Sequence, residues 1–206
     1  MSLFAAVVLT GTGCKDTTAG NPFAGGSAAG ESSSAGKDKP GRQTPVREAK
    51  TVPGVCRAII QKAKPTGFPP DIKYEEKGGT GAFSGPSSTC SGDSYDNSSF
   101  ELSASVSVHP GDTGSDGKKR TGSEAVAEHL DMLRTLNEDG GGGEVIDLPP
   151  ADGAYIGPQA LGTSVEVYQA NVMVRVLYRD EAKSREQLLT DVKAMALAVL
   201  GEVKFE

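Results

Sequence analysis

The sequence predicts an α+β domain, in which helices pack on an antiparallel β-sheet, preceded by a disordered tether. Two observations predict the sheet. Apolar and polar residues alternate over residues 99–108, which is the period of a strand with one buried face. Residues 165–176 form a hairpin whose two halves match residue by residue. A third observation predicts a long amphipathic helix over residues 181–203, because one apolar stripe runs along it: Leu188, Val192, Met195, Val199 and Val203.

The first half of the domain is expected to begin with a short helix over residues 55–64, which stops at Pro65. A strand over residues 72–77 follows, and a Gly/Ser-rich loop then continues up to Cys90. The alternating strand over residues 99–108 comes next and ends at a His-Pro-Gly-Asp turn.

A second helix is expected over residues 123–137. Thr121 and Glu124 fit a capping box, apolar residues recur at helical spacing, and the glycine run at 140–143 ends the helix. The order of elements is therefore helix, strands, helix, strands and helix. Hairpins and short loops between such elements favour an antiparallel sheet.

The hairpin can be placed in register because apolar residues then oppose apolar ones and an acid opposes a base. A two-residue turn at Ala170-Asn171 pairs Val165 with Val176, Glu166 with Arg175, Val167 with Val174 and Tyr168 with Met173. A shift by one residue would destroy this match. Asn171 suits a turn residue with positive φ. The second strand is apolar on both faces and is predicted to lie in the centre of the sheet.

Composition divides the 206-residue chain into a tether and one domain. Residues 15–50 are mostly Gly, Ser, Ala, Thr, Pro and charged residues, with Phe23 and Val46 almost the only large apolar side chains. Such a segment buries too little apolar surface to offset the entropy of ordering, so we expect disorder and a reach of roughly 30–36 Å. Residues 51–206 are long enough for a single domain with its own core.

Charge divides at the same boundary. Residues 1–50 have a net charge of +2, whereas residues 51–206 hold 15 basic and 23 acidic residues, a net charge of −8. An acidic domain lacks the basic surface that phosphate contacts need, so no nucleic acid is expected as a partner. The basic residues of the tether are interpreted as solvated charges rather than as a contact to an anionic envelope polymer.

The first fourteen residues resemble a truncated signal peptide with a lipobox. An apolar run from Leu3 to Leu9 leads into Thr-Gly-Thr-Gly and then Cys14, and small residues before such a cysteine are typical of a secretory signal whose cysteine becomes lipidated. A basic n-region is missing, which a late start would explain. Alternatively, Cys14 is an ordinary thiol on a disordered tail. The first interpretation predicts an extracytoplasmic protein anchored to the cell membrane by the lipid on Cys14.

Two cysteines remain for the domain, Cys56 and Cys90. An even pair in an exported domain indicates a disulfide, which would close a loop of about 35 residues and stabilise the fold by roughly 3–4 kcal/mol. The alternative is two buried thiols in a cytosolic protein. The sequence has neither a C-x-x-C motif nor a Cys/His ligand spacing, so no metal site is expected.

These features together resemble the actinobacterial cell-envelope lipoproteins of unknown function, the LpqN/LppA-like and related DUF lipoprotein families. The shared features are the lipobox, the low-complexity tether, Cys56 opening the first helix, Cys90 in the first sheet segment, and the terminal amphipathic helix. The segment Gly153-Ala154-Tyr155, which follows a Leu-Pro-Pro run, and the hairpin strand that begins at Asn171 complete the resemblance. The resemblance implies an envelope-exposed α+β domain that binds or senses and has no recognised catalytic residues.

No catalytic constellation is apparent from the residues themselves. His109 is interpreted as a strand-end residue and His129 as a packed or rim residue of a helix, and no G-x-S-x-G nucleophile elbow is present. The glycine run at 140–143 is followed by Glu144 rather than by Lys and Ser or Thr, so it is not a phosphate-binding loop. No cofactor is therefore expected.

Two residues are candidates for ligand binding. Tyr155 lies in a Pro/Gly-rich loop over residues 148–159, where binding residues tend to sit, although packing of its ring on the sheet explains it equally well. Arg175, a cation on a central strand, would hold an anionic ligand or else pair with Glu166. The sequence thus predicts a lipid-anchored, non-catalytic module that binds an envelope ligand or a protein partner. The alternative is an enzyme or enzyme accessory of cell-wall metabolism.

Overall fold

The computed structural model describes residues 47–68, 73–81, 83–93, 99–138, 142–157 and 162–206. Its centre is a seven-stranded sheet in which all neighbours pair antiparallel, in the order β1-β2-β3-β9-β8-β7-β6. The strands are β1 (Glu75–Thr80), β2 (Pro86–Asp93), β3 (Phe100–Val108), β6 (Glu144–Ile146), β7 (Gly153–Gly157), β8 (Thr163–Gln169) and β9 (Val172–Asp180). The second strand of the predicted hairpin, β9, lies at the centre of this order, as its two apolar faces indicated.

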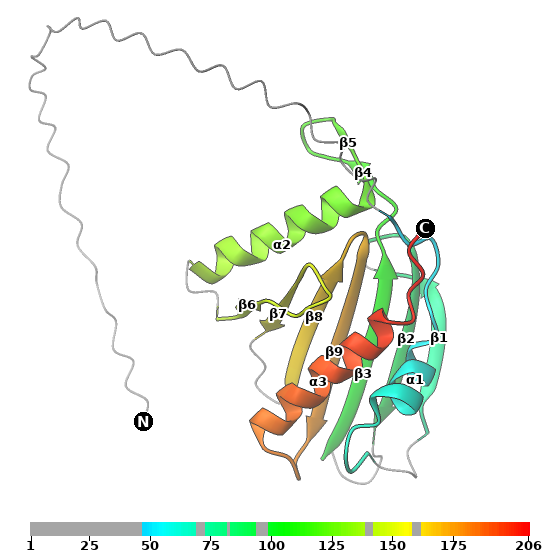
Figure 1. The fold of residues 1–206 in the computed structure, drawn as a ribbon, viewed down its shortest axis with the longest axis vertical. Helices are drawn as coiled ribbons and strands as arrows, with labels where there is room; N and C mark the ends of the chain where they lie inside the picture. Colours follow the sequence, from blue (N-terminus) through cyan, green and yellow to red (C-terminus); the bar gives the residue numbers. More distant parts are fainter. Residues whose placement is uncertain (1–46, 69–72, 82, 94–98, 139–141, 158–161) are drawn as a thin grey trace, which may run out of the picture. The chain divides into compact units, whose positions relative to one another are not determined.

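Helices cover this sheet (Figure 1). The short α1 (Val55–Ala58), continued by a π-helical turn over Ile59–Ala63, and the C-terminal α3 (Arg185–Leu200) pack together on one face. The long α2 (Gly122–Glu138) packs on the other face and follows a two-stranded ribbon of β4 (Asp112–Thr113) and β5 (Lys119–Arg120). The predicted class, an α+β domain with an antiparallel sheet and a C-terminal helix, is confirmed.

The main core lies between the sheet and the pair α1 and α3. Alternate residues of a strand point to opposite faces, so Val106, Val174 and Val176 turn the same way and are completely buried there. The predicted apolar stripe faces them, and all its members are buried, four of them in α3 and Val203 just beyond its end. The helix itself is shorter than the predicted range 181–203. It begins after Ser184, because that side chain and Gln187 form a capping box, and it ends at Gly201.

A second, smaller apolar cluster fixes α2 to the opposite face. Val126 and Leu130 of α2 pack on Tyr168 of β8 and Met173 of β9, which the hairpin register places directly opposite each other. The capping box at the start of α2 is also present, since the Glu124 carboxylate accepts hydrogen bonds from the backbone N–H and hydroxyl of Thr121. The two faces of the hairpin are thus buried against different helices.

The hairpin register is confirmed at every predicted pair. One detail of the turn differs from the expectation. Ala170, with φ of 47°, takes the left-handed conformation rather than Asn171. Asn171 is instead buried, at 2% exposure, and its side chain bonds backbone groups of Ala49 and His109. The amide is therefore needed for these long-range bonds and not for the shape of the turn.

The structure corrects several local predictions. The loop expected up to Cys90 is the strand β2, and the loop expected over residues 148–159 contains the strand β7. Both segments are rich in Ser, Gly or Pro and lack clear alternation, so their own sequence did not indicate strands. Each is hydrogen-bonded to a neighbour on both sides, which supplies the order that local preference does not. The strand expected over residues 72–77 lies later, in β1; β4, β5 and β6 were not predicted.

The N-terminal end of the described chain is attached to its C-terminal end. Ala49 forms a β-bridge with Phe205, and the backbone groups of Glu48 and Glu206 exchange two hydrogen bonds. Glu48 also accepts hydrogen bonds from the backbone N–H and hydroxyl of Ser123 at the start of α2. Residues 48–50, assigned to the tether by composition, are thus hydrogen-bonded to the domain. None of the described helices is long and apolar enough to cross a membrane.

Candidate functional site

A cavity of about 920 Å³ lies between the first turns of α3 and the outer strands of the sheet, and its volume is in the range typical of ligand sites. Two smaller cavities, of about 370 and 510 Å³, lie beside Lys183 and along α2. The large cavity has one wall from the sheet and one from the helix. Its main side chains are Glu144, Ile156, Thr163, Arg185, Leu188 and Leu189.

The sheet wall is built by strand pairing. Glu144, the first residue of β6, pairs directly with Ile156 of β7, so the two side chains lie next to each other on one face. This is the face of the main core, because Ile156 in turn pairs with the buried Val165 of β8. Ile156 is partly buried against that core. The sheet wall therefore presents a carboxylate beside an aliphatic side chain.

The helix wall follows from the N-terminus of α3. Because Ser184 caps the helix, Arg185 is its first residue, and Leu188 and Leu189 follow at spacings of three and four residues. Side chains at these spacings lie on the same side of a helix, so a cation stands next to two aliphatic side chains. The positive end of the helix dipole lies at the same place.

The two charged groups of the cavity are available to a ligand. Glu144 and Arg185 are both exposed, and neither has an ion-pair partner among the residues that the structure describes. Leu188, in contrast, is only 8% exposed. The cavity thus combines one anion and one cation, neither of which forms an ion pair within the described residues, with the partly exposed side chains of Ile156 and Leu189.

The residues that the sequence suggested for binding lie elsewhere, on the opposite face of the sheet. Tyr155 pairs with Glu166, and Glu166 pairs with Arg175, so the three side chains form one row across β7, β8 and β9. The Tyr155 ring is partly buried against the α2 cluster. Neither Tyr155 nor Arg175 lines the large cavity. The structure therefore brings the two candidates close together, but away from the cavity.

Arg175 is engaged within the sheet. Its Nε lies 3.3 Å from a carboxylate oxygen of Glu166, whose other oxygen accepts a hydrogen bond of 2.6 Å from the Tyr168 hydroxyl. Burial of the Tyr168 ring raises the pKa of Tyr168 far above its usual value, and the hydrogen bond to the Glu166 carboxylate adds to this effect. Glu166 therefore joins the exposed guanidinium to the buried phenol, and this contact accounts for Arg175 without a ligand.

The two histidines meet around one aromatic ring. The Phe83 ring lies 4.8 Å from the His109 ring and 6.0 Å from the His129 ring, measured between centroids. His109 Nδ1 accepts a hydrogen bond from the Gly111 N–H, and its Nε2 lies 3.8 Å from the Asp112 carboxylate. Burial lowers the pKa of His109, against the smaller opposing effect of Asp112. Neither histidine lines any of the three cavities.

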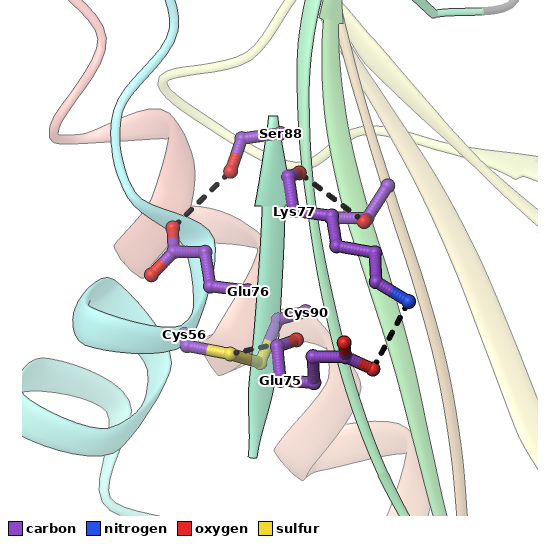
Figure 2. The surroundings of a disulfide bond; sticks show 7 residues. Cys56, Glu75, Glu76, Lys77, Ser88 and Cys90 are labelled. Atoms are coloured by element: carbon purple, nitrogen blue, oxygen red, sulfur yellow. Dashed lines mark hydrogen bonds and ion pairs between the residues drawn. A yellow bond between two sulfur atoms is a disulfide. The ribbon is translucent and has the colours of Figure 1, made fainter. Parts of the chain in front are cut away.

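Cys56 and Cys90 are joined by a disulfide, with the two Cα atoms 5.0 Å apart (Figure 2). The bridge ties α1 to β2 across the main core, and both cysteines are buried. Beside the bridge, the Ser88 hydroxyl of β2 donates to the Glu76 carboxylate of the edge strand β1, and Lys77 pairs with Glu75 within β1. Cys14 lies outside the described residues.

The residues of the cavity were not predicted as site residues. The sequence placed Leu188 in the stripe of the last helix, but no motif marked Arg185 or Glu144. These two residues are 41 positions apart, and only the pairing of β6 with β7 and the docking of α3 bring them to one cavity. The only local signal in the sequence was the position of Arg185, three residues before Leu188 of the apolar stripe.

No protein-family model matches this chain, and no curated protein matches it. Among solved structures, a GTP-binding regulator from Thermotoga maritima is similar over 77% of this chain and 98% of its own length, with 12% sequence identity and a TM-score of 0.37. A similarity of this extent carries no information on the ligand or activity of this chain.

Proposed function

We propose that this protein is an exported module of the cell envelope, anchored to the membrane by a lipid on Cys14, whose domain binds a ligand and catalyses no reaction. The observation that carries the binding function is the cavity between α3 and the outer strands. It is an open hollow of mixed polar and apolar lining, in which Ile156 and Leu189 lie near two charges that have no ion-pair partner in the described chain. Ligand sites likewise combine apolar side chains with a few polar groups.

Export is supported by the disulfide between Cys56 and Cys90, because such bonds persist in oxidising compartments. It is also supported by the sequence before the domain, a lipobox-like segment followed by a low-complexity stretch. The proposal includes the membership suggested by sequence, that of an actinobacterial envelope lipoprotein. The membrane contact of the protein is then the lipid, and the domain is held within reach of the membrane by the tether.

Intact mass measurement of the protein from the membrane fraction of its native host tests the location. We expect a diacylglyceryl adduct on Cys14 and a mass deficit of two protons from the disulfide. An unmodified mass with three free thiols would refute both the anchor and the export. Native mass spectrometry of the same preparation tests binding: a bound small molecule that is lost in the Ile156→Trp variant, which places a bulky ring in the cavity, supports the proposed function.

Among the described residues, the approach of His109 to Asp112 is the observation that favours the alternative, an enzyme or enzyme accessory of cell-wall metabolism. This pair belongs to a corner that joins the end of β3 to the ribbon before α2, where Asp112 also accepts two hydrogen bonds from Arg120. If His109 were a general base, His109→Asn would abolish a wall-modifying activity of the native protein while the fold persisted. We expect no such activity to be lost.

A further inference from the structure

We propose that the cavity between α3 and the outer strands takes a short peptide with an aliphatic body, a free amino group and a free carboxylate. This inference rests on the proposed ligand-binding function and adds the chemical class of the ligand.

The two charges of the cavity, one of each sign, favour a ligand that carries both an anionic and a cationic group. The Arg185 guanidinium is a planar donor that matches a carboxylate, and the N-terminus of α3 adds partial positive charge at the same end. Glu144, on the opposite wall, accepts from an ammonium group. A purely anionic ligand would satisfy Arg185 and meet the uncompensated carboxylate of Glu144. A purely cationic ligand would meet the reverse situation.

The aliphatic side chains require an apolar body between those charges. Ile156 lies beside Glu144 on the sheet wall, and Leu188 and Leu189 lie beside Arg185 on the helix wall. A small polar zwitterion would leave the partly exposed Ile156 and Leu189 in water, whereas Leu188 is already buried in the core. A neutral aliphatic molecule would cover them but would bury the neighbouring charges without partners, which costs free energy.

The strand that carries Glu144 also offers an open edge to a peptide backbone. β6 is the last strand of the sheet, so its outer edge has no strand neighbour among the described residues. An extended peptide satisfies such an edge with backbone hydrogen bonds. The other carboxylate near Arg185, that of Glu186, lines the separate cavity beside Lys183 and does not occupy this site.

The test uses the full chain and NMR titration with the dipeptide L-leucyl-L-leucine, its N-acetyl form and its C-terminal amide. We expect saturable shifts at Gly157 and Leu188 and a Kd on the order of 0.1–1 mM for the free dipeptide. Acetylation and amidation should each weaken binding roughly fivefold, since each removes one charge contact.

The variants assign each charge to its partner. Arg185→Gln should remove the effect of amidation and keep the effect of acetylation, and Glu144→Gln should do the opposite. Arg134→Gln, which removes an exposed cation on α2 outside this cavity, is the matched control and should leave all affinities unchanged. Urea unfolding of each variant verifies that the fold is intact.

Three results overturn the proposal. If the three dipeptides bind equally, or if the charge variants do not change their order, the ligand is not recognised by its termini. If octanol shifts the cavity residues and the dipeptides do not, the ligand class is wrong while the binding cavity stands. If neither octanol nor the dipeptides shift these residues, both this inference and the proposed binding function fail.

Discussion

Replacement of Asn171 by Ala is expected to be one of the most destabilising single changes outside the apolar core. The Asn171 side chain accepts a hydrogen bond of 2.7 Å from the Ala49 N–H and donates bonds of 2.9 and 3.1 Å to the carbonyls of Ala49 and His109. The β-bridge of Ala49 uses the backbone groups of Glu48, so the groups of Ala49 itself turn to Asn171. Asn171→Ala would leave three buried backbone groups without these partners.

Each buried group that loses its partner costs about 1–3 kcal/mol, with some relief from local movement, so we expect a loss of about 3–5 kcal/mol in the free energy of unfolding. Urea unfolding of the oxidised protein measures this value. Hydrogen exchange gives a second readout, because protection of the Ala49 amide should disappear. Gln169→Ala, two residues away in the same hairpin, is the control and should change stability by less than about 0.5 kcal/mol.

The charge variant Asn171→Asp sharpens the test. Its carboxylate still accepts from the Ala49 N–H, but it faces two carbonyl oxygens to which asparagine donates. It should therefore be less stable than wild type at neutral pH and recover part of the loss as the pH falls and the carboxyl is protonated. A loss of less than about 1 kcal/mol in Asn171→Ala, with unchanged protection of Ala49, would refute the reasoning.

Three further changes have defined outcomes. Replacing both Cys56 and Cys90 by serine should lower the free energy of unfolding by about 3–4 kcal/mol, since the bridge closes a long loop in the unfolded chain; reduced wild type must match the double variant if the bond alone is responsible. Burial lowers the pKa of His109 from the ordinary value of 6.5, so below that pH the unfolded chain binds more protons than the folded one, and stability falls as the pH falls. His109→Asn should flatten this slope just below pH 6.5, and an unchanged slope in urea unfolding would contradict the assignment. Gly122→Ala should cost more than about 2 kcal/mol, because the added Cβ would lie 2.0 Å from the His109 carbonyl oxygen and 2.7 Å from the Asn171 Cβ; a variant that unfolds at the urea concentration of wild type would show that the corner yields easily.

The hairpin is the element that local sequence patterns predicted in most detail. Its register was predictable because side chains on each strand alternate with a strict period of two. In that register Val165 and Val167 oppose apolar residues, and Glu166 opposes a base. The strand β3 and the stripe of α3 were predictable for the same kind of reason. In these segments the spacing of the buried apolar residues also shows whether the segment is a strand or a helix.

The strands β2 and β7 were not predictable in that way. Their Ser-, Gly- and Pro-containing sequences match a loop as well as a strand, and their order comes from neighbours on both sides and, for β2, from the bond of Cys90 to Cys56. For Tyr155 the consequence is direct. It was assigned to a loop, but it lies in β7 in a row with Glu166 and Arg175, on the face away from the large cavity.

The sequence by itself determined the α+β class, the central hairpin with its register, and the apolar face of the last helix, because these features depend on patterns within single segments. The tertiary structure alone decided where the free charges gather. No sequence pattern links Glu144 to Arg185. They line one cavity because β6 pairs at the end of the sheet and α3 packs across the face of that sheet. The same holds for Asn171, which suited a turn by sequence and instead holds the start of the domain through three hydrogen bonds to distant backbone. Periodicity within a segment fixes which side chains are buried, whereas contacts between distant segments depend on how the whole chain packs.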